Sequence, residues 1–310
     1  MGAPPRRVGL VEAPHRPDSR RLALTTQDAI RQAGGEVWLA PSWDVPWVAG
    51  ALPETDLVIC FGGDGTLIQG ARLAAPLGVP IVGVNFGKMG FLAEFEPEEL
   101  GSRLPVLLAG EFWVEERLTL AVEHRRGGRL LDRFLAINEA LVARGRVNRL
   151  LRLHTWLDGQ YVTTYAADGL LVSTPTGSTG SNLAAHGPVL PPDMEALILA
   201  PVMPFISFPN PIVLPASSRL DVQVVLTPPP PQHDAVLFVD SGTSVTVQDG
   251  DRIGITGSDV RARFARVRQR HYFHAVLVAK LQRAPIEPPL PPDTPSPDGS
   301  AGEPQIRNSE

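Results

Sequence analysis

A strand, a glycine-rich turn and a helix follow one another between Leu57 and Leu77, and this order constrains the fold more than any other feature. Leu57–Phe61 is an uninterrupted apolar run of strand length, and Gly-Gly-Asp-Gly-Thr follows it at residues 62–66. Apolar positions at helical spacing continue from Leu67 to Leu77. Glycine lets backbone N–H groups approach phosphate oxygens without an intervening Cβ. The sequence therefore predicts a phosphate-binding loop of the strand–turn–helix type.

Asp64 is the unusual member of this turn, because phosphates repel a carboxylate that has no task among them. It could hold a divalent cation or take a proton from an attacking hydroxyl. Gly62, Gly63 and Gly65 would support the phosphates, and Thr66 would cap the helix. The alternative is a tight turn with Asp64 as an ordinary turn residue, which three glycines after a buried strand disfavour. The spacing matches neither Walker A nor GxGxxG.

A second glycine-rich segment, Asp-Gly-Leu-Leu-Val-Ser-Thr-Pro-Thr-Gly-Ser-Thr, spans residues 168–179. Leu170–Val172 is typical of a buried strand end, and Pro175 and Gly177 predict a turn after it. Hydroxyl and N–H groups there suit the oxygens of a nucleotide. They come from Thr174, Thr176, Ser178 and Thr179. On its own, the segment favours an ordinary surface turn equally well.

The first part of the chain alternates strands and helices, which predicts a parallel α/β sheet. The predicted strands are Arg7–Val11, Glu36–Ala40, Leu57–Phe61 and Ile81–Val84, the predicted helices are Ser19–Ala33 and the segment after Thr66, and Pro41–Pro53 is predicted as a loop.

From Trp113 onward the pattern becomes rich in β-strands and predicts an antiparallel domain. The predicted strands are Val114–Glu123, Arg129–Arg144, Leu150–Leu157, Gln160–Tyr165, Leu220–Leu226, Val236–Val239, Ser244–Val247 and Arg252–Ile255. Tyr272–Gln282 returns to a helical pattern. Ala284–Glu310 is rich in Pro, Ser and Glu and is predicted to be a disordered tail.

Composition excludes several classes of function. The formal net charge of -5 gives no indication of nucleic acid or an anionic membrane as a partner. No apolar run reaches transmembrane length, and residues 1–11 lack a signal-peptide core. The one cysteine, Cys60, lies in a predicted buried strand and cannot form an internal disulfide. We therefore expect a cytoplasmic protein.

The motifs, taken in order, resemble one family. Residues 62–66 resemble the GGDGT motif of NAD kinases, diacylglycerol and sphingosine kinases and phosphofructokinases. Asn-Phe-Gly-Lys-Met-Gly-Phe-Leu-Ala-Glu at 85–94, the pair Asn138-Glu139 and Pro-Asn-Pro-Ile-Val-Leu-Pro at 209–215 resemble stretches of NAD kinases. Residues 168–179 are similar to the second glycine-rich motif of that family. The ordered set, from about Val8 to Leu281, is specific to NAD kinases.

The resemblance implies an α/β N-terminal domain with a parallel sheet and a mainly antiparallel β C-terminal domain. The GGDGT-bearing domain would span 1–112, the β-rich NAD-binding domain 113–267, and 268–283 would pack back on the first domain. The tail would span 284–310.

It also implies a reaction and roles for residues. An NAD kinase moves the γ-phosphoryl group of ATP, or of another donor such as polyphosphate, to the adenosine-ribose 2′-hydroxyl of NAD. Asp64 would be the catalytic proton acceptor. Asn138 and Glu139 would bind adenine and its ribose, Asp168 the nicotinamide side, and Phe91 would stack near the nicotinamide ring. The other implied NAD-binding residues are Asn85, Thr176, Thr179, Gly180, Ser181 and Asp240, the last in a late Asp-Gly motif with Ser241 inserted. Without the resemblance, Asn138-Glu139 would be an ordinary turn.

The implied cofactor is a divalent cation such as Mg²⁺, with no ligand residue assigned, and the implied assembly is a homodimer or homotetramer. Two alternatives stay open: a non-catalytic NAD(P)-binding regulator with the same fold, and a lipid kinase sharing GGDGT.

Four residues depart from the family's pattern. Ser181 stands where the family has a tyrosine that stacks on adenine, and Gly180 precedes it in place of alanine. His186 stands at the first glycine of an Ala-Gly-Gly-Pro stretch, and Phe205 replaces a histidine. Together they predict a remodelled substrate pocket.

Overall fold

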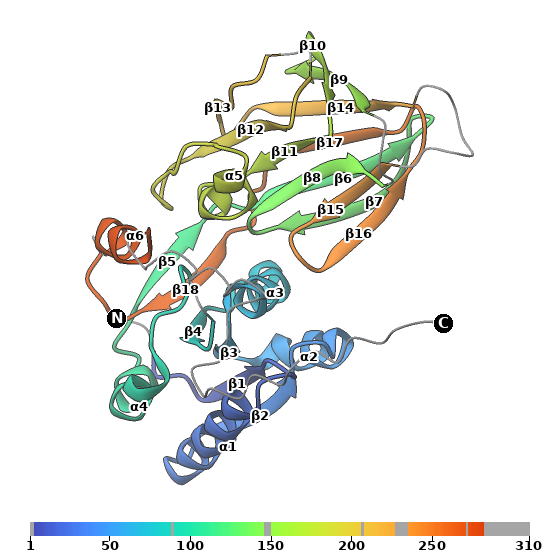
Figure 1. Cartoon of the computed structure of the whole chain (residues 1–310). Coiled ribbons are helices and arrows are strands. Elements are labelled where there is room, and N and C mark those ends of the chain that lie inside the picture. The colour runs from blue at the N-terminus through green and yellow to red at the C-terminus, as the bar shows by residue number, and fades with distance from the viewer. Residues whose placement is uncertain are drawn as a thin grey trace, which may run out of the picture.

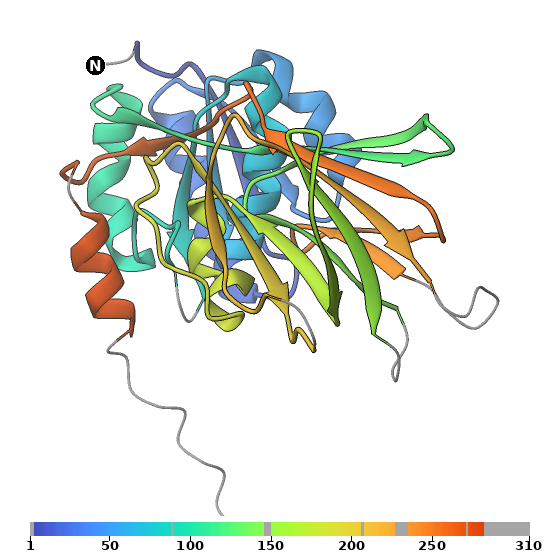
Figure 2. The same cartoon turned by 90° about the horizontal axis from the view of Figure 1, so that it is seen from above.

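The computed structural model describes residues 3–87, 90–145, 150–205, 208–226, 235–270 and 272–281. The predicted tail at 284–310 lies outside these residues. Figures 1 and 2 show two regions: helices gather around a first sheet, and the second region is built almost wholly of strands. No described helix has the length and apolarity needed to cross a membrane.

The first region contains a six-stranded sheet of order β2-β1-β3-β4-β18-β5. The first four strands pair in parallel, whereas β18 pairs parallel with β4 and antiparallel with β5. These strands are β1 (Arg7–Glu12), β2 (Glu36–Pro41), β3 (Leu57–Gly62), β4 (Ile81–Asn85), β5 (Trp113–Arg117) and β18 (Ala262–Arg266). The predicted parallel α/β sheet is confirmed, and β3 is buried throughout, as its apolar run indicates.

Helices cover both faces of this sheet. Apolar residues of α1 (Pro17–Gln32) and α4 (Leu100–Leu108) pack on one face, and those of α2 (Val45–Ala51) and α3 (Asp64–Ala74) pack on the other. Short 3₁₀ turns extend or precede these helices at Leu52–Glu54, Ala75–Leu77 and Pro97–Glu99. The α3 helix, which follows the glycine turn after β3, thus packs on the same face of the sheet as α2.

The predicted loop over Pro41–Pro53 is wrong, because it contains α2. The Asp44 carboxylate accepts a hydrogen bond from the Trp47 N–H at 3.3 Å and caps the helix, and Pro46 occupies its first turn. The Trp47 ring packs edge-on against Trp38, with ring centroids 5.4 Å apart. The cap residue and the proline were both visible in the sequence.

The second region consists of two antiparallel six-stranded sheets, β10-β9-β14-β17-β6-β7 and β13-β12-β11-β8-β15-β16. One apolar cluster fills the space between them, with residues from strands of both sheets. The strands are β6 (Leu120–Arg126), β7 (Arg129–Ala136), β8 (Glu139–Arg144), β9 (Leu151–Leu157), β10 (Gln160–Ala167), β11 (Gly169–Ser173), β12 (Ala196–Val202), β13 (Ile212–Pro215), β14 (Arg219–Val225), β15 (Ala235–Val239), β16 (Thr243–Val247) and β17 (Arg252–Gly257). The predicted antiparallel β architecture is confirmed.

Two predicted strands are each divided in the structure. Val114–Glu123 breaks at residues 118–119, and Arg129–Arg144 breaks at residues 137–138. In both cases the two halves belong to different sheets, so the break is where the chain changes sheet. The sequence pattern also missed β12, β13, β18, α4 and the short α5 (Ser181–Ala184).

The chain enters the second region after β5 and returns to the first with β18, so these two strands join the regions (Figure 1). The predicted C-terminal helix is confirmed as α6 (Phe273–Leu281). Tyr272, just before α6, hydrogen-bonds Glu115 of β5, which places the start of this helix against the first sheet. The predicted domain limits at residues 112 and 267 stay predictions.

Candidate active site

The GGDGT turn leads directly from β3 into α3. The helix begins at Asp64, with Gly63 as its N-cap residue and without a side-chain cap. The predicted capping role of Thr66 is therefore wrong, because the helix already starts two residues before it. Thr66 instead lies against Gly62, where its side chain fills the space that a Cβ would need. The Gly63 carbonyl accepts the first helical hydrogen bonds, from the N–H groups of Thr66 and Leu67.

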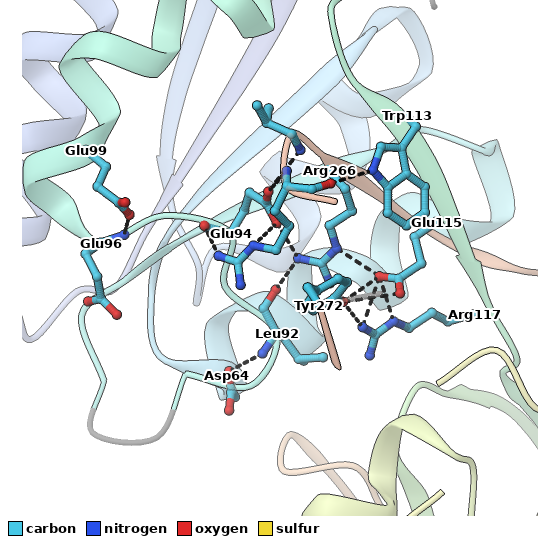
Figure 3. A network of polar contacts seen from close by, with 12 residues as sticks. Asp64, Leu92, Glu94, Glu96, Glu99, Trp113, Glu115, Arg117, Arg266 and Tyr272 are labelled. Atoms are coloured by element: carbon cyan, nitrogen blue, oxygen red, sulfur yellow. Dashed lines mark hydrogen bonds and ion pairs between the residues drawn. The ribbon is translucent and has the colours of Figure 1, made fainter. Parts of the chain in front are cut away.

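The Asp64 carboxylate is held by the backbone of a second loop. The Phe91 N–H donates to Oδ2 and the Leu92 N–H donates to Oδ1, each at 3.1 Å. Figure 3 shows Asp64 directed at Leu92. Each carboxylate oxygen therefore has one donor from the protein and a lone pair left for a further partner.

Asn85 shapes the loop beside the glycine turn. Its side chain is buried; Oδ1 accepts from the Gly87 N–H at 3.0 Å, and Nδ2 donates to the Glu96 carboxylate at 3.1 Å. Gly87 packs against Gly63, whose Cα would lie only 3.1 Å from a Cβ at Gly87. The two loops thus pack backbone to backbone. Direct contact of Asn85 with NAD stays a prediction.

Asp240 organises the break between β7 and β8. Its Oδ1 accepts from the N–H groups of Asn138 (2.8 Å) and Glu139 (3.1 Å), and its Oδ2 accepts from the Ile137 N–H (2.9 Å). Burial raises the pKa of Asp240, although these N–H groups and the Arg72 charge favour the ionised form. A side chain a hundred residues away thus fixes the conformation of Asn138 and Glu139.

Asn138 and Glu139 carry polar atoms that the described residues leave open. The Asn138 Oδ1 and the Glu139 Oε2 are buried and have no hydrogen-bond partner in the described part of the chain. The Ser181 hydroxyl donates to the other carboxylate oxygen, Oε1 of Glu139. Burial raises the pKa of Glu139, and the Asp240 charge raises it further. Buried acceptors without donors are rare in proteins and point to a missing partner.

The second glycine-rich segment packs on this pair. The Thr174 N–H donates to the Asn138 carbonyl at 2.8 Å, and the Thr174 hydroxyl donates to the Ile137 carbonyl at 2.7 Å. A Cβ at Gly177 would collide with that same Asn138 carbonyl, so only glycine fits there. Within the described part of the chain, the Thr176 hydroxyl accepts a long contact from Arg117 and the Thr179 hydroxyl donates one to the Thr176 carbonyl, each at 3.4 Å.

Two neighbouring clefts meet at Ser181 and Leu141. The smaller, of about 330 Å³, joins α3 to the polar pair; its lining residues are Ile68, Asn138, Glu139, Leu141, Ser181, Phe238, Asp240 and Ser241. The larger, of about 670 Å³, is mostly apolar; its lining includes His186, Pro201, Val202, Met203 and Asn210. The structure thus brings together Asn138, Glu139, Ser181 and Asp240, whereas Asp64 and Phe91 lie outside both linings.

Asp168 lies at the opposite end of β11 from the glycine-rich turn. A five-residue strand spans roughly 17 Å, so Asp168 and Thr176 lie too far apart to contact the same group of a ligand. The Asp168 carboxylate forms an ion pair with Arg144 at 2.8 Å, and its N–H donates to the Val202 carbonyl at 3.0 Å. Val202 lines the larger cleft, so Asp168 is hydrogen-bonded to a residue of that cleft.

The residues that depart from the family pattern lie around the larger cleft. His186 lines it and has a φ of 59°, in the left-handed region that favours glycine. This explains why glycine stands there in the family's pattern. Gly180 has a φ of -94° and thus does not use glycine's freedom at positive φ. The Phe205 side chain is 72% exposed.

Sequence reasoning missed the buried residues that support the loop that holds Asp64. Arg266, Glu115 and Tyr272 form a buried polar network behind Asp64 (Figure 3). The signal that the sequence offered was a charged residue, Glu115, within a predicted apolar strand; the strand that carries Arg266 was not predicted. No group of three or more His, Cys, Asp or Glu side chains among the described residues could hold a metal ion.

Comparison with known proteins agrees with this geometry. The family model for the ATP-NAD kinase N-terminal domain matches residues 22–112, and that for the C-terminal domain matches residues 137–267. An NAD kinase of Dehalococcoides mccartyi (strain CBDB1) is 36% identical over 278 residues, 89% of this chain and 96% of that protein. An NAD kinase of Desulforamulus reducens is 40% identical over 230 residues, 74% of this chain and 78% of that protein.

Two solved structures share the fold. A yeast NADH kinase complexed with NADH gives a TM-score of 0.78 at 19% identity, covering 92% of this chain and 90% of that one. An NAD kinase from Archaeoglobus fulgidus in complex with ATP gives a TM-score of 0.71 at 26% identity, covering 89% and 98%. These relatives favour neither the lipid-kinase nor the non-catalytic alternative. The chain belongs to the ATP-NAD kinase family.

Proposed function

We propose that this chain transfers the γ-phosphoryl group of ATP to the adenosine-ribose 2′-hydroxyl of NAD, and that Asp64 accepts the proton of that hydroxyl. A bond forms between the 2′-oxygen and the γ-phosphorus, the bond from that phosphorus to the β–γ bridging oxygen breaks, and ADP leaves. Asp64 keeps a free lone pair on each oxygen while two N–H groups fix its orientation. A fixed acceptor reduces the entropy that the reaction must lose.

The observation that carries this proposal is the pair of open acceptors on Asn138 and Glu139. An adenine amino group and a ribose hydroxyl are donors that would satisfy the Asn138 Oδ1 and the Glu139 Oε2. Both atoms belong to residues of the cleft that reaches α3, the helix that starts at Asp64. Adenosine bound there would bring its ribose toward the Asp64 end of that helix.

The larger cleft suits the rest of the dinucleotide. It runs from Ser181 to Val202 and Met203, and its mostly apolar lining suits a flat nicotinamide ring. Asp168, hydrogen-bonded to Val202, would meet the nicotinamide end. Thr176, Thr179 and Gly180 would line the path, and Phe91 would stack near the ring.

The phosphoryl donor would bind at the start of α3. Gly62, Gly63 and Gly65 would present backbone N–H groups at the positive end of the helix dipole. Thr66 would lie beside the phosphates, since its own N–H already donates to the Gly63 carbonyl. A divalent cation such as Mg²⁺ would take most of its ligands from phosphate oxygens and water, because the described residues hold no cluster of metal ligands. Bound there, the cation would neutralise phosphate charge. ATP and polyphosphate both carry the terminal phosphates that this site would bind.

We also propose a homodimeric or homotetrameric assembly in the cytoplasm. The assembly is supported by large apolar side chains exposed together beside the larger cleft, at Met203, Phe205 and Phe208.

The direct test is to incubate the pure protein with NAD, Mg²⁺ and either ATP or polyphosphate, and to measure NADP. Parallel reactions with NADH in place of NAD, and with EDTA in place of Mg²⁺, define the acceptor and the cation requirement. We expect NADP with at least one donor and none with EDTA. Absence of NADP with both donors at high enzyme concentration contradicts the proposed reaction.

A further inference from the structure

The orientation of the Asp64 carboxylate depends on one short piece of backbone. Among the described residues its two hydrogen-bond donors, at 3.1 Å each, are the N–H groups of the adjacent residues Phe91 and Leu92. A shift of this dipeptide would turn or release the carboxylate. Whatever holds residues 91–92 therefore also holds the proposed proton acceptor.

Arg266, the last residue of β18, holds that backbone from behind. Its Nη1 donates to the Leu92 carbonyl at 2.9 Å and to the Glu94 carboxylate at 3.2 Å (Figure 3). Glu94 in turn accepts from the N–H groups of Val267 and Arg268, at 2.9 and 2.7 Å. The strand end at residues 266–268 thus clamps residues 92–94.

The Arg266 side chain is fully buried, which makes its partners decisive. Its Nε donates to Glu115 at 2.8 Å, and its guanidinium lies 5.1 Å from the Phe264 ring centroid and 5.2 Å from that of Tyr272. Burial opposes ionisation of Glu115, but Arg117 and Arg266 hold its pKa below the ordinary value. A buried guanidinium is tolerated only with such partners, so Glu115 fixes where Arg266 can lie.

The network continues to Tyr272, just before the C-terminal helix, and to the second glycine-rich segment. The Tyr272 hydroxyl donates to Glu115 at 3.0 Å and accepts from Arg117 Nη2 at 2.7 Å. Arg117 Nη1 reaches the Thr176 hydroxyl at 3.4 Å. One buried cluster thus contacts both the loop that orients Asp64 and the second glycine-rich turn.

We infer that Arg266 is a positioning residue for Asp64: it fixes the Phe91–Leu92 peptide whose N–H groups orient the carboxylate, and Glu115 and Tyr272 fix Arg266. The inference rests on the proposed function, since it gives a task to the acceptor that the reaction needs. It assigns to β5, β18 and the start of α6 a part in catalysis although none of their residues lines either of the two clefts.

The test compares Arg266→Lys in two backgrounds, the wild type and Asp64→Asn. Lysine keeps the charge but cannot reach Glu115 and the Leu92 carbonyl together. NADP formation is measured as kcat and KM, and kcat is expressed per chain that binds NAD, counted by calorimetry, so that misfolded chains do not contribute. Arg126→Lys is the matched control, because it weakens a bidentate Arg–Asp251 pair in the second region, away from Asp64.

We expect Arg266→Lys to lower kcat by about 10-fold with an unchanged KM, because a misplacement of ~1 Å can cost on the order of 10²-fold. In the Asp64→Asn background the same substitution should change kcat by less than about 2-fold, since residues that act as one unit are non-additive. A purely structural role would give the same fold-loss in both backgrounds, and that result would overturn the inference.

Tyr272→Phe provides a milder probe if Arg266→Lys does not fold. Removal of one hydroxyl should lower kcat by about 3-fold in the wild type and leave the Asp64→Asn variant unchanged, as expected for loss of a supporting hydrogen bond. If Tyr272→Phe leaves kcat unchanged in the otherwise wild-type protein, the inference is contradicted. An inactive wild-type protein would instead contradict the proposed function, so the two failures are distinct.

Discussion

Two carboxylates of the candidate site, Asp64 and Glu139, differ in the hydrogen bonds that the protein gives them. Asp64 has one backbone N–H on each oxygen. Glu139 has one oxygen bound to the Ser181 hydroxyl and the other buried with no partner among the described residues. In the proposed reaction, Asp64 would therefore be oriented before any ligand binds, whereas Glu139 would gain a hydrogen-bond partner only from the ligand.

This difference separates catalysis from binding. A pre-formed acceptor affects the transition state most, so changes at Asp64 should appear in kcat. An open hydrogen-bonding site gains its partner when the dinucleotide binds, so changes at Glu139 and its supports should appear in KM for NAD.

Asp64→Asn should lower kcat by about 10²-fold or more, as for loss of a general base, with KM for NAD within about 2-fold. The amide keeps the size of the carboxylate but loses its basicity. Steady-state NADP formation checks this. Asp56→Asn is the matched control, because the Asp56 carboxylate also accepts two backbone N–H groups, from Arg6 and Arg7, at an exposed distant edge. Near-normal turnover of Asp64→Asn would assign the proton acceptor to another group.

Asp240→Asn should raise KM for NAD by about 30-fold with little change in kcat. The substitution leaves three backbone donors facing a neutral amide whose NH₂ group cannot accept, at a cost of roughly 2 kcal/mol. The Asn138–Glu139 turn would then lose its support.

Asp158→Asn is the control for this change. Asp158 and Asp240 both have a positive φ, of 50° and 48°. The Asp158 carboxylate likewise accepts a backbone N–H, from Arg219, but in a hairpin turn outside both cleft linings. Its KM for NAD should equal that of the wild type. A larger fall in kcat than rise in KM for Asp240→Asn would contradict the separation between catalysis and binding.

Local patterns predicted the parts of the fold that are local. The strand–turn–helix unit at Leu57–Leu77 and the antiparallel strands were confirmed, because apolar runs and turn residues act on neighbours in sequence. The predictions of Val114–Glu123 and Arg129–Arg144 as single strands were wrong, because the groups that stabilise each break lie far away in the sequence. At the break at residues 137–138, the Asp240 carboxylate accepts a hydrogen bond from the Ile137 N–H. At the break at residues 118–119, the Thr119 hydroxyl donates to the Val260 carbonyl. No spacing rule places such distant partners.

The same limit applies to the site. The glycine turn and the Asn138–Glu139 pair were found through motifs, and the structure shows two of that pair's polar atoms open. Arg266 and Glu115 are 151 residues apart, and only the pairing of β18 with β5 brings them together. The sequence placed Glu115 in a predicted strand, but it did not predict the strand of Arg266 and could not show that the two residues form an ion pair.

Glu139→Gln should raise KM for NAD by about 10-fold at neutral pH, because an ionised acceptor worth roughly 1.5 kcal/mol is lost. Burial raises the pKa of Glu139, so its carboxylate gains a proton at a higher pH than an exposed glutamate. In the wild type, KM for NAD should therefore rise as the pH falls through that pKa. The variant should show no such rise, and kinetics across mildly acidic pH would check it.

The same shift has a consequence for stability. A carboxyl whose folded-state pKa is raised destabilises the fold when ionised, so stability falls as the pH rises from the ordinary glutamate range through the raised pKa. Glu139→Gln should remove this loss. The difference in Tm between variant and wild type should grow over that interval and then level off; a difference independent of pH would contradict it.

Ser181→Tyr should lower KM for NAD by about 5-fold, since base–aromatic stacking contributes roughly 1 kcal/mol or more. Ser181 lines both clefts, so a ring placed there has space beside the open acceptors. The substitution also removes the hydroxyl that donates to Glu139. Ser181→Ala measures that loss alone, and the ratio of the two KM values isolates the stacking term. A Ser181→Tyr value equal to or above that of Ser181→Ala would mean that the adenine does not lie against residue 181, and that the open oxygens of Asn138 and Glu139 face another part of the dinucleotide.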